Sequence, residues 1–335
     1  MLRLATWNVE WFDALFDDDG KLLPGDAPSR RHGVSRAEQA SAVAHVLNAL
    51  DADAVLVVEA PDTGSRRSTR LALEGFADRH DLRQRAALIG FANETQQEIA
   101  LLHDPTRIVA RHDPRASAEA PRFDGRFAMD LDIDAAPEDV SFSKPPLEVA
   151  LSRPDGSTLP RLIGVHLKSK APHGARGPDD VMRLSIANRR KQLAQAVWLR
   201  ARIDDHLAAG EPLIVAGDLN DGPGLDAFEA LFGRSSIEIV RGAGAGVLHD
   251  PHAEAAMQGR FGARATTARF YIAEERRYLQ ALLDYLFVSP ELVPVARGWR
   301  IWHPFDDPEC WHDVPLRAAL LAASDHYPVT LDLDL

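Results

Sequence analysis

The chain is short of cysteine, of long apolar stretches and of positive charge, and each shortage excludes a class of protein. Cys310 is the one cysteine among 335 residues, which excludes a disulfide framework and a cysteine-based zinc site and leaves an inert thiol as the expectation. No apolar stretch approaches the length needed to span a membrane. The formal net charge of -12 argues against long, non-specific docking on duplex DNA, where neutralised phosphates supply the affinity.

An export signal is also missing from the first residues. The segment 1–10, MLRLATWNVE, enters a strand-like alternation directly, without a charged region, an apolar region and a small-residue cleavage site. We therefore expect a cytoplasmic protein, and secretion only if residue 1 is not the native start. No obligate protein partner is evident.

Short apolar runs predict the β-strands. Several runs are almost continuously apolar, which is typical of sheets covered on both faces. The predicted strands are Leu2–Val9, Ala54–Ala60, Ala86–Phe91, Glu98–His103, Phe127–Ile133, Leu147–Leu151, Leu162–Leu167, Leu213–Leu219, Leu282–Val288, Ala296–Trp302 and Tyr327–Leu335.

Helix signals are fewer. Ser35 and Glu38 have the spacing of a capping box, in which each side chain bonds the other residue's backbone amide. A longer helix is predicted from about Asp180 to Ala209, and a short one at Asp226–Phe232. Residues 105–126 and 241–268 are rich in Gly, Pro, Ala and Arg and predict surface loops.

The strands outnumber the helices, and helices stand between only some of them. This order favours an α/β fold in which two mixed sheets pack together with helices outside. Polar residues at strand ends are scattered from Asn8 to His326, so a cut in the middle would divide any site that they share. The sequence therefore predicts a single domain, 1–335.

Asp218 and Asn220 directly follow the buried strand segment 213–217. Side chains two residues apart on a strand share a face, and Gly217 leaves room for close approach. A carboxylate and an amide leaving a buried strand are costly unless something uses them. The turn chemistry of 220–224 explains the pair equally well. Asn8 and Glu10 repeat the spacing at the end of the first strand.

Three more polar residues lie at or within apolar strands. Glu59 ends the run 54–58 and suits Mg²⁺, which prefers oxygen ligands, although a solvated strand end would look the same. His166 precedes Lys168 and Lys170, which suits a phosphate-bearing ligand, although a lone histidine is more often structural. Asp284 needs a partner inside its strand, and His326 is the candidate, because an aspartate fixes the tautomer of an imidazole.

Together these pieces resemble the endonuclease/exonuclease/phosphatase superfamily, the metal-dependent fold that includes DNase I and exonuclease III. The matching segments come in the family's order: TWNVE at 6–10, VE at 58–59, GVHLKS at 164–169, GDLN at 217–220, LDY at 283–285 and SDH at 324–326. The family often has Gln before the metal-binding Glu, where this chain has Val58. The match is nearest to a bacterial nuclease-type branch, often secreted.

The resemblance implies a four-layer α/β sandwich with the site at one edge of two packed mixed β-sheets. It implies Mg²⁺, with Mn²⁺ as the alternative, held by Glu59 with help from Glu10 and Asp325. Asp218 would activate water, Asn220 would hold the phosphate, and Asp284 would orient His326. Phosphate would contact Asn8, Lys168, Asn220, His166 and His326, and Glu98 would orient His166.

Nucleic acid is the expected substrate. Basic clusters at Arg30–His32, Arg66–Arg70 and Arg189–Lys191 could track a backbone, and Trp302 and Trp311 could stack bases. Taken separately, each cluster is better explained as a solvated face, and the tryptophans as loop packing.

Three alternatives stay open. A phosphatase or phosphodiesterase acting on a small-molecule or lipid-headgroup phosphate suits the acidic composition. A non-catalytic binding module would have damaged catalytic positions, and these positions are intact. A sugar-cleaving hydrolase would use Glu59 and Asp218 but leave both histidines unexplained.

Overall fold

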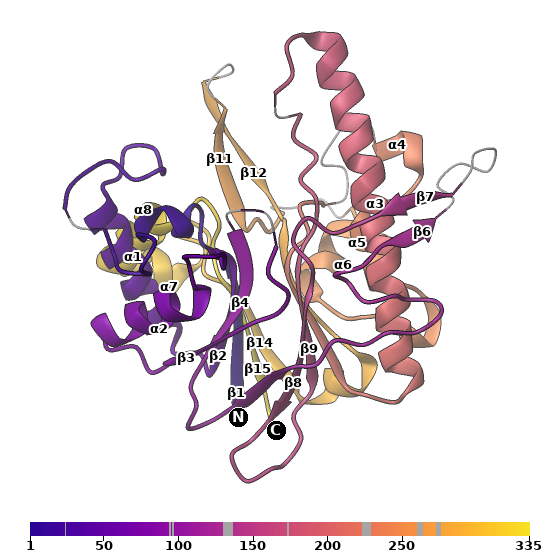
Figure 1. Ribbon diagram of the computed structural model, residues 1–335, viewed down its shortest axis with the longest axis horizontal. Helices are drawn as coiled ribbons and strands as arrows, with labels where there is room; N and C mark the ends of the chain where they lie inside the picture. The colour runs from indigo at the N-terminus through magenta and orange to yellow at the C-terminus, as the bar shows by residue number, and fades with distance from the viewer. Residues whose placement is uncertain are drawn as a thin grey trace.

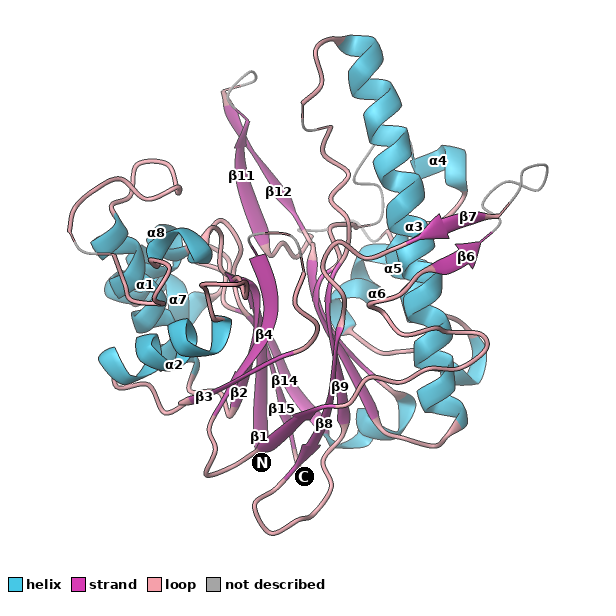
Figure 2. Ribbon diagram, in the orientation of Figure 1, coloured by secondary structure: helices cyan, strands magenta, loops and turns pink. Residues whose placement is uncertain are grey.

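The computed structural model describes residues 1–23, 25–93, 95, 97–129, 137–172, 174–222, 229–259, 264–272 and 276–335. Two mixed β-sheets lie face to face in the middle of the molecule, with helices on the outer face of each (Figures 1 and 2). The arrangement is the predicted α/β fold with two packed sheets and flanking helices.

In the described part of the chain, the larger sheet has six strands. Its order is β14 (Ala296–Ile301), β15 (Val329–Leu333), β1 (Leu2–Asn8), β2 (Ala54–Pro61), β4 (Gln97–His103) and β3 (Ala86–Ile89). Strands β1 and β2 are parallel, with Asn8 opposite Val58, and the other pairs are antiparallel. The parallel pair brings the ends of two predicted site strands to one edge.

The smaller sheet repeats this arrangement. Its described strands run in the order β13 (Asp284–Val288), β10 (Leu213–Asp218), β9 (Arg161–His166), β8 (Leu147–Ser152) and β5 (Val109–His112). Strands β9 and β10 are parallel, with His166 opposite Asp218, and β13 is antiparallel to β10, with Asp284 opposite Asp218. Pairing alone therefore sets three predicted site residues in one row.

The helices cover the outer faces. The larger sheet carries α1 (Arg36–Leu50), α2 (Thr69–Arg79) and α8 (Val314–Ala323), and the smaller sheet carries α3 (Pro178–Ala208), α5 (Ser236–Arg241) and α6 (Pro251–Met257). The other described helices are α4 (Glu229–Phe232), α7 (Pro308–His312) and the 3₁₀ turns η1 (Phe12–Leu15), η2 (Gly244–Gly246) and η3 (Pro290–Val295). None of the helices in the described ranges is long and apolar enough to cross a membrane.

The core is divided into three layers. Leu4, Leu56, Leu162, Ile214 and Leu331 belong to the cluster between the two sheets, and separate apolar clusters fill the space between each sheet and its helices. Both faces of the central strands are therefore buried, which explains why their sequences are continuously apolar rather than alternating.

Helix starts differ in one respect from the prediction. Ser35 accepts a hydrogen bond from the Glu38 N–H at 3.2 Å, which is half of the predicted capping box. The complete, reciprocal box lies at Ser235 and Glu238, at the start of α5. The short helix predicted at Asp226–Phe232 is observed as α4 over its last four residues, Glu229–Phe232. Residues 226–228 lie outside the described residues.

Two predicted loops contain regular structure. Strand β5 lies within 105–126, and α6 lies within 241–268, where the Asp250 carboxylate accepts hydrogen bonds from the N–H groups of His252 and Ala253. Strand β6 (Phe127–Met129) begins the predicted run to Ile133 and pairs with β7 (Glu138–Val140), while residues 130–136 lie outside the described part.

A hairpin of β11 (Ala268–Ile272) and β12 (Arg277–Ala281) was not predicted. It rises from the edge of the sheets where the predicted site residues gather (Figure 1). Its sequence has many exposed polar side chains, because it projects into solvent instead of joining a covered sheet, and so it lacks the apolar signature of the other strands.

Gly217 is a position where β10 and β9 approach too closely for any side chain. Its φ is 135°, and a Cβ there would lie 2.0 Å from the Val165 carbonyl oxygen. We predict that Gly217→Ala lowers the free energy of unfolding by about 2–5 kcal/mol, through backbone strain and overpacking. Urea denaturation measures the effect.

Gly75 provides the matched control, because it lies inside α2 and no atom lies within 4 Å of a Cβ built there. Gly75→Ala should raise the free energy of unfolding by roughly 0.5–1 kcal/mol. Equal stability of the two variants would contradict the account of Gly217.

Candidate active site

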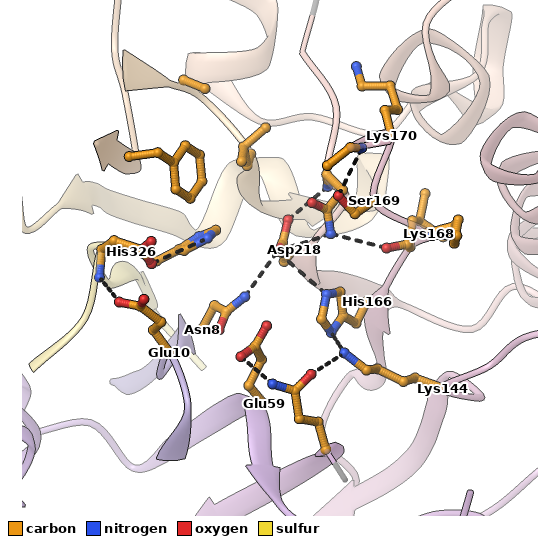
Figure 3. A pocket seen from close by; sticks show the side chains of 18 of the residues that line it. Asn8, Glu10, Glu59, Lys144, His166, Lys168, Ser169, Lys170, Asp218 and His326 are labelled. Atoms are coloured by element: carbon orange, nitrogen blue, oxygen red, sulfur yellow. Dashed lines mark hydrogen bonds and ion pairs between the residues drawn. The ribbon is translucent and has the colours of Figure 1, made fainter. Parts of the chain in front are cut away.

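The predicted site residues meet in one pocket of about 680 Å³ at the edge where β1, β2, β9 and β10 end. Figure 3 shows their side chains converging from both sheets. Of the predicted residues, Asn8, Glu10, Glu59, His166, Lys168, Asp218, Asn220, Asp325 and His326 line the pocket, whereas Glu98 and Asp284 are not among its lining residues.

Asp218 lies at the centre of the pocket and is buried. Its Oδ2 accepts from the Asn8 side-chain Nδ2 at 3.0 Å, and its Oδ1 accepts from the Asn220 backbone N–H at 2.7 Å. Burial, and then the charge of Asp284, raises the pKa of Asp218 to about 7. A carboxyl with this pKa exchanges protons near neutral pH, as a general base does.

Asp284 and His326 form the predicted contact. The Asp284 Oδ2 lies 2.7 Å from the His326 Nδ1, and both residues are buried. Burial opposes a charge on the imidazole, but the Asp284 carboxylate outweighs it, and the pKa of His326 is raised well above the usual value. The raised pKa favours the imidazolium form of His326, whose Nε2 lines the pocket 4.0 Å from the Asp325 Oδ1.

Asn220 is fixed by its backbone as well as by its side chain. Its φ is 51°, in the left-handed region that asparagine tolerates. The Nδ2 donates to the Leu167 carbonyl at 3.1 Å, and the Asn220 carbonyl accepts from the Gln192 side chain at 3.0 Å. The amide is thus held beside Asp218, as the shared strand face predicted.

Glu59 projects into the pocket from a β-bulge. The register of β2 against β4 shifts between Val58 and Ala60, and Glu59 has a φ of 61°. Its carboxylate accepts from the Gln97 side chain at 2.6 Å and from the Trp11 backbone N–H at 3.3 Å. A bulge is a usual means of re-aiming one side chain of a strand toward a site.

Glu10 and Asp325 are neighbours in the same wall. Glu10 forms an ion pair with Arg31 and accepts from the Asp325 backbone N–H at 3.3 Å. Burial raises the pKa of Asp325 to about 7, and the charges of Glu10 and Glu59 contribute to the increase. Three carboxylates that repel one another across a pocket form a site that a cation would stabilise.

Asn8 adds an oxygen to this wall. Its Oδ1 is buried and has no hydrogen-bond partner, although its Nδ2 is bonded to Asp218. An unpaired, buried amide oxygen beside carboxylates fits a hard cation such as Mg²⁺. The donor set at this end of the pocket is therefore suitable for a divalent metal.

A second group also has ligand atoms close together. Within the described ranges, Asp218, Asp284 and His326 have ligand atoms within 4.8 Å of one another, whereas the predicted set of Glu59, Glu10 and Asp325 forms no such group. We favour the carboxylate wall, because the Nδ1 of His326 already bonds Asp284 and Mg²⁺ bridges longer gaps through its bound waters.

The predicted role of Glu98 is wrong. Its carboxylate accepts from the Asn93 side chain at 2.6 Å and from the N–H groups of Asn93 and Thr63, and it makes no contact with His166. Burial raises the pKa of Glu98 to about 7. Strand alternation turns Glu98 away from the pocket and Gln97 into it, so the neighbouring residue reaches the site.

Lys144 takes the place that was predicted for Glu98. Its Nζ lies 3.1 Å from the His166 Nδ1 and donates to the Gln97 Oε1 at 2.7 Å (Figure 3). An ammonium has donors only, so Nδ1 must accept and the ring proton must lie on Nε2. Burial, and then Lys144, lowers the pKa of His166 well below its usual value.

A continuous chain of contacts therefore links the two halves of the pocket. It runs from Glu59 through Gln97 and Lys144 to His166, whose Nε2 lies 3.7 Å from the Asp218 Oδ2. Neither Gln97 nor Lys144 was predicted. Lys144 lies in the loop before β8, and no strand pattern marks it as part of a site.

For the tryptophans and the basic clusters, the structure decides between the alternatives that the sequence left open. Trp302 is buried and donates to the Thr330 hydroxyl at 3.0 Å, so it cannot stack on a base, whereas Trp311 is exposed. The basic clusters are largely paired: Arg31 with Glu10, Arg67 with Asp18 and Asp62, Arg70 with Glu74, Arg189 with Asp221 and Arg190 with Glu138.

The single cysteine agrees with the expectation of an inert thiol. Cys310 is buried, and burial raises the pKa of its thiol to about 12, so the reactive thiolate is disfavoured at neutral pH.

We predict that Lys144→Met releases the tautomer of His166 and raises its pKa, because the donor and the positive charge at Nδ1 are lost together. Ring ¹⁵N NMR across a pH series reports both properties. Lys168→Met is the matched control, since Lys168 also lowers the pKa of His166 but is not bonded to its ring. An Nε2–H tautomer that persists in Lys144→Met would show that the lysine does not fix it.

The architecture has known counterparts. Solved structures with similar folds include truncated TDP2 from Caenorhabditis elegans, with a TM-score of 0.51, 14% identity, and coverage of 98% of this chain and 96% of that chain. The 3' phosphatase NExo from Neisseria has a TM-score of 0.51, 15% identity and 100% coverage of both chains. An AP endonuclease from Archaeoglobus fulgidus has a TM-score of 0.50, 12% identity and 100% coverage of both.

At such identities these structures establish the fold alone. No curated protein gives a significant match to the sequence. A family model described as the Endonuclease/Exonuclease/phosphatase family matches residues 5–326, a range that contains every predicted site residue. The chain belongs to the Endonuclease/Exonuclease/phosphatase family.

Proposed function

We propose that this chain, acting as a single domain over residues 1–335, is a divalent-metal-dependent hydrolase of phosphodiester bonds in nucleic acid. The observation that carries the proposal is the environment of Asp218. This buried carboxylate lies between two asparagines, with the His166 Nε2 3.7 Å away and the Asp284–His326 pair in the adjacent strand and loop.

The side chains divide the work of hydrolysis. Asp218, with its pKa of about 7, orients an attacking water and accepts its proton. Asn8 and Asn220 hold the base. Contact of the Asn220 amide with the phosphate requires its Nδ2 to leave Leu167 or Asp218, which together engage both of its protons. His326 as an imidazolium, and His166 through its Nε2–H, donate to phosphoryl oxygens where negative charge increases in the transition state. Lys168 adds a positive charge at the pocket wall.

The metal would be held by Glu59, with Glu10, Asp325 and the Asn8 amide oxygen beside it. Mg²⁺ is the first choice and Mn²⁺ the second. When bound, it would neutralise phosphate charge and stabilise the leaving oxygen. Gln97 and the Trp11 N–H already orient the Glu59 carboxylate, as outer partners orient metal ligands in other sites.

Nucleic acid is favoured as substrate by the fold relatives. The solved NExo structure is described as bound to a product DNA hairpin, and another relative is described as an AP endonuclease. A small phosphate ester is the second candidate, because the basic clusters outside the pocket are mostly neutralised by acids. Plasmid, single-stranded DNA, RNA, bis(para-nitrophenyl) phosphate and phosphorylated metabolites, each assayed with Mg²⁺ and with EDTA, separate the candidates.

We predict that Asp218→Asn lowers phosphodiester hydrolysis by roughly 10²–10⁴-fold or more, because the base is lost. The same variant should be at least as stable as the parent at pH 8 in EDTA. The pKa of Asp218 is raised from 3.8 to about 7 in the folded state, so wild-type stability falls as pH rises between these values. Asparagine cannot ionise, so the stability of Asp218→Asn should not fall over this pH range for that reason.

Urea denaturation at several pH values provides the measurement. Hydrolysis by Asp218→Asn at the wild-type rate would sink the assignment of the base. Replacement of His326 is a poorer test, because it would leave Asp284 as a buried carboxylate without a partner and would destabilise the fold by about 3–5 kcal/mol.

Glu59→Gln should raise the Mg²⁺ concentration needed for half-maximal activity by roughly 10–100-fold or more. That is the loss of metal affinity caused elsewhere by removing a residue that only orients a ligand, and Glu59 would be a ligand itself. The titration of activity with Mg²⁺ measures the change. Glu98→Gln is the matched control, because Glu98 is a buried glutamate one strand away that is held by Asn93 and Thr63. Equal Mg²⁺ dependence of the two variants would exclude Glu59 as the metal ligand.

A further inference from the structure

The β11–β12 hairpin has two faces with different surroundings. Phe270, Leu279 and Ala281 line the pocket, and the Phe270 ring lies 5.4 Å from the His326 ring. Strand alternation places Arg269 and Tyr271 on the opposite face, where Tyr271 is directly across from Tyr278. One strand pair therefore forms a wall of the active site and carries a second surface behind it.

This second surface is a continuous chain of rings and guanidinium groups. The Tyr271 and Tyr278 rings are 5.2 Å apart, and the Arg269 guanidinium lies 3.4 Å from the Tyr278 ring centre and 5.4 Å from that of Phe305. Phe305 then contacts Trp311 at 6.4 Å, and Arg317 lies 4.4 Å over Trp311. We call these six residues the aromatic–arginine strip: Arg269, Tyr271, Tyr278, Phe305, Trp311 and Arg317.

All four rings of the strip are exposed. Their exposed fractions are 55% for Tyr271, 48% for Tyr278, 40% for Phe305 and 46% for Trp311. Among the described residues, the one other exposed aromatic ring is Trp11, which lines the pocket beneath Arg30. The exposed rings of the described residues thus lie either in the pocket, as Trp11 does, or in this one strip, whereas scattered single rings would need no explanation.

The charge of the strip is positive. Neither Arg269 nor Arg317 has an ion pair within the described ranges, unlike the arginines of the basic clusters. Four acidic residues lie in the same segment. Asp307 and Glu309 pair with Arg300, Asp313 accepts from the Leu316 N–H, and Asp306 lies 3.3 Å from the His303 ring. Arg317 donates one hydrogen bond to the Trp311 carbonyl at 2.7 Å, and no carboxylate holds either guanidinium in the described part of the chain, so both can still contact an anionic ligand.

We infer that the aromatic–arginine strip binds unpaired nucleotides of the substrate strand that continue beyond the scissile phosphate. This inference rests on the proposed function and deepens it by naming single-stranded nucleic acid as the substrate class. Bases stack on exposed rings whatever their sequence, and arginines contact the intervening phosphates. A strand that leaves the pocket past Phe270 needs only to turn around the hairpin to reach Arg269 and Tyr278.

Duplex nucleic acid is the poorer fit. In a duplex the faces of the bases are covered by their neighbours, and only phosphates would meet the strip. The chain has a net charge of -12, and binding through phosphates alone requires a broad basic surface. Rings that are exposed at this site gain contacts from unpaired bases and very little from paired ones.

Binding of a fluorescent oligothymidine to the full-length Asp218→Asn protein in EDTA, followed by anisotropy, tests the inference without cleavage. Tyr271→Ala, Tyr278→Ala or Trp311→Ala should each weaken binding by roughly 5- to 100-fold, the range for loss of one stacked base. Tyr278→Phe keeps the ring and should restore binding. A hairpin duplex of equal length should bind more weakly and respond little to these substitutions.

Leu71→Ala is the matched control, because Leu71 is an exposed apolar side chain on α2 outside the strip. Oligothymidine affinity that is the same in the alanine variants and the parent would overturn the inference. The inference would also be overturned if the alanine variants lost duplex affinity as much as oligothymidine affinity, because the strip would then contact phosphates only. Concentration-dependent dimers that disappear in the variants, with nucleic-acid binding unchanged, would assign the strip to a second copy of this chain.

The two proposals fail separately. Hydrolysis of bis(para-nitrophenyl) phosphate by the wild-type protein tests the catalytic assignment and needs no strip. Oligothymidine binding by the inactive variant tests the strip and needs no hydrolysis. Loss of one result with survival of the other therefore identifies which proposal is wrong.

Discussion

The hydrogen bond between the Asn8 amide and the Asp218 carboxylate is the contact on which the arrangement of the pocket depends. Asn8 ends a strand of the larger sheet and Asp218 ends a strand of the smaller one, so this 3.0 Å bond joins the two sheets at the edge where they enclose the site. A buried carboxylate is costly unless it is hydrogen-bonded. The sheets must therefore stay in this register, because separation would leave Asp218 with the Asn220 amide alone.

That constraint explains why the two histidines are in opposite electrostatic states. His326 is paired with Asp284, which lies opposite Asp218, and these two carboxylates raise its pKa and favour its cationic form. His166 also lies opposite Asp218, but its other neighbour is Lys144, and a second cation there would be repelled. One imidazole thus supplies charge, and the other supplies a neutral N–H. A developing phosphoryl charge would meet donors of different strength on its two sides.

Strand ends were predictable from the sequence, and contacts made by loops were not. Asp218, Asn220, Asp284 and His326 follow or begin apolar runs, and sheet pairing then brings them together without any further signal. Gln97 and Glu98 could not be assigned to faces, because the bulge at Glu59 shifts the register of their strand partner. Lys144 lies in a loop, where no periodicity reports direction. Base stacking and loop packing could not be separated for Trp302 from the sequence, because its partner Thr330 is distant in the chain.

The hairpin was missed for a related physical reason, since its two faces have different surroundings. Strands inside a covered sheet must be apolar, and the proposed catalytic residues at their ends are fixed by that burial. The hairpin projects into solvent, so its outer face is free of packing constraints and holds Arg269, Tyr271 and Tyr278. Its inner face still positions Phe270 against His326. A change on the outer face of the hairpin therefore leaves the bonds among Asn8, Asp218 and Asn220 intact, because none of these bonds involves a hairpin residue.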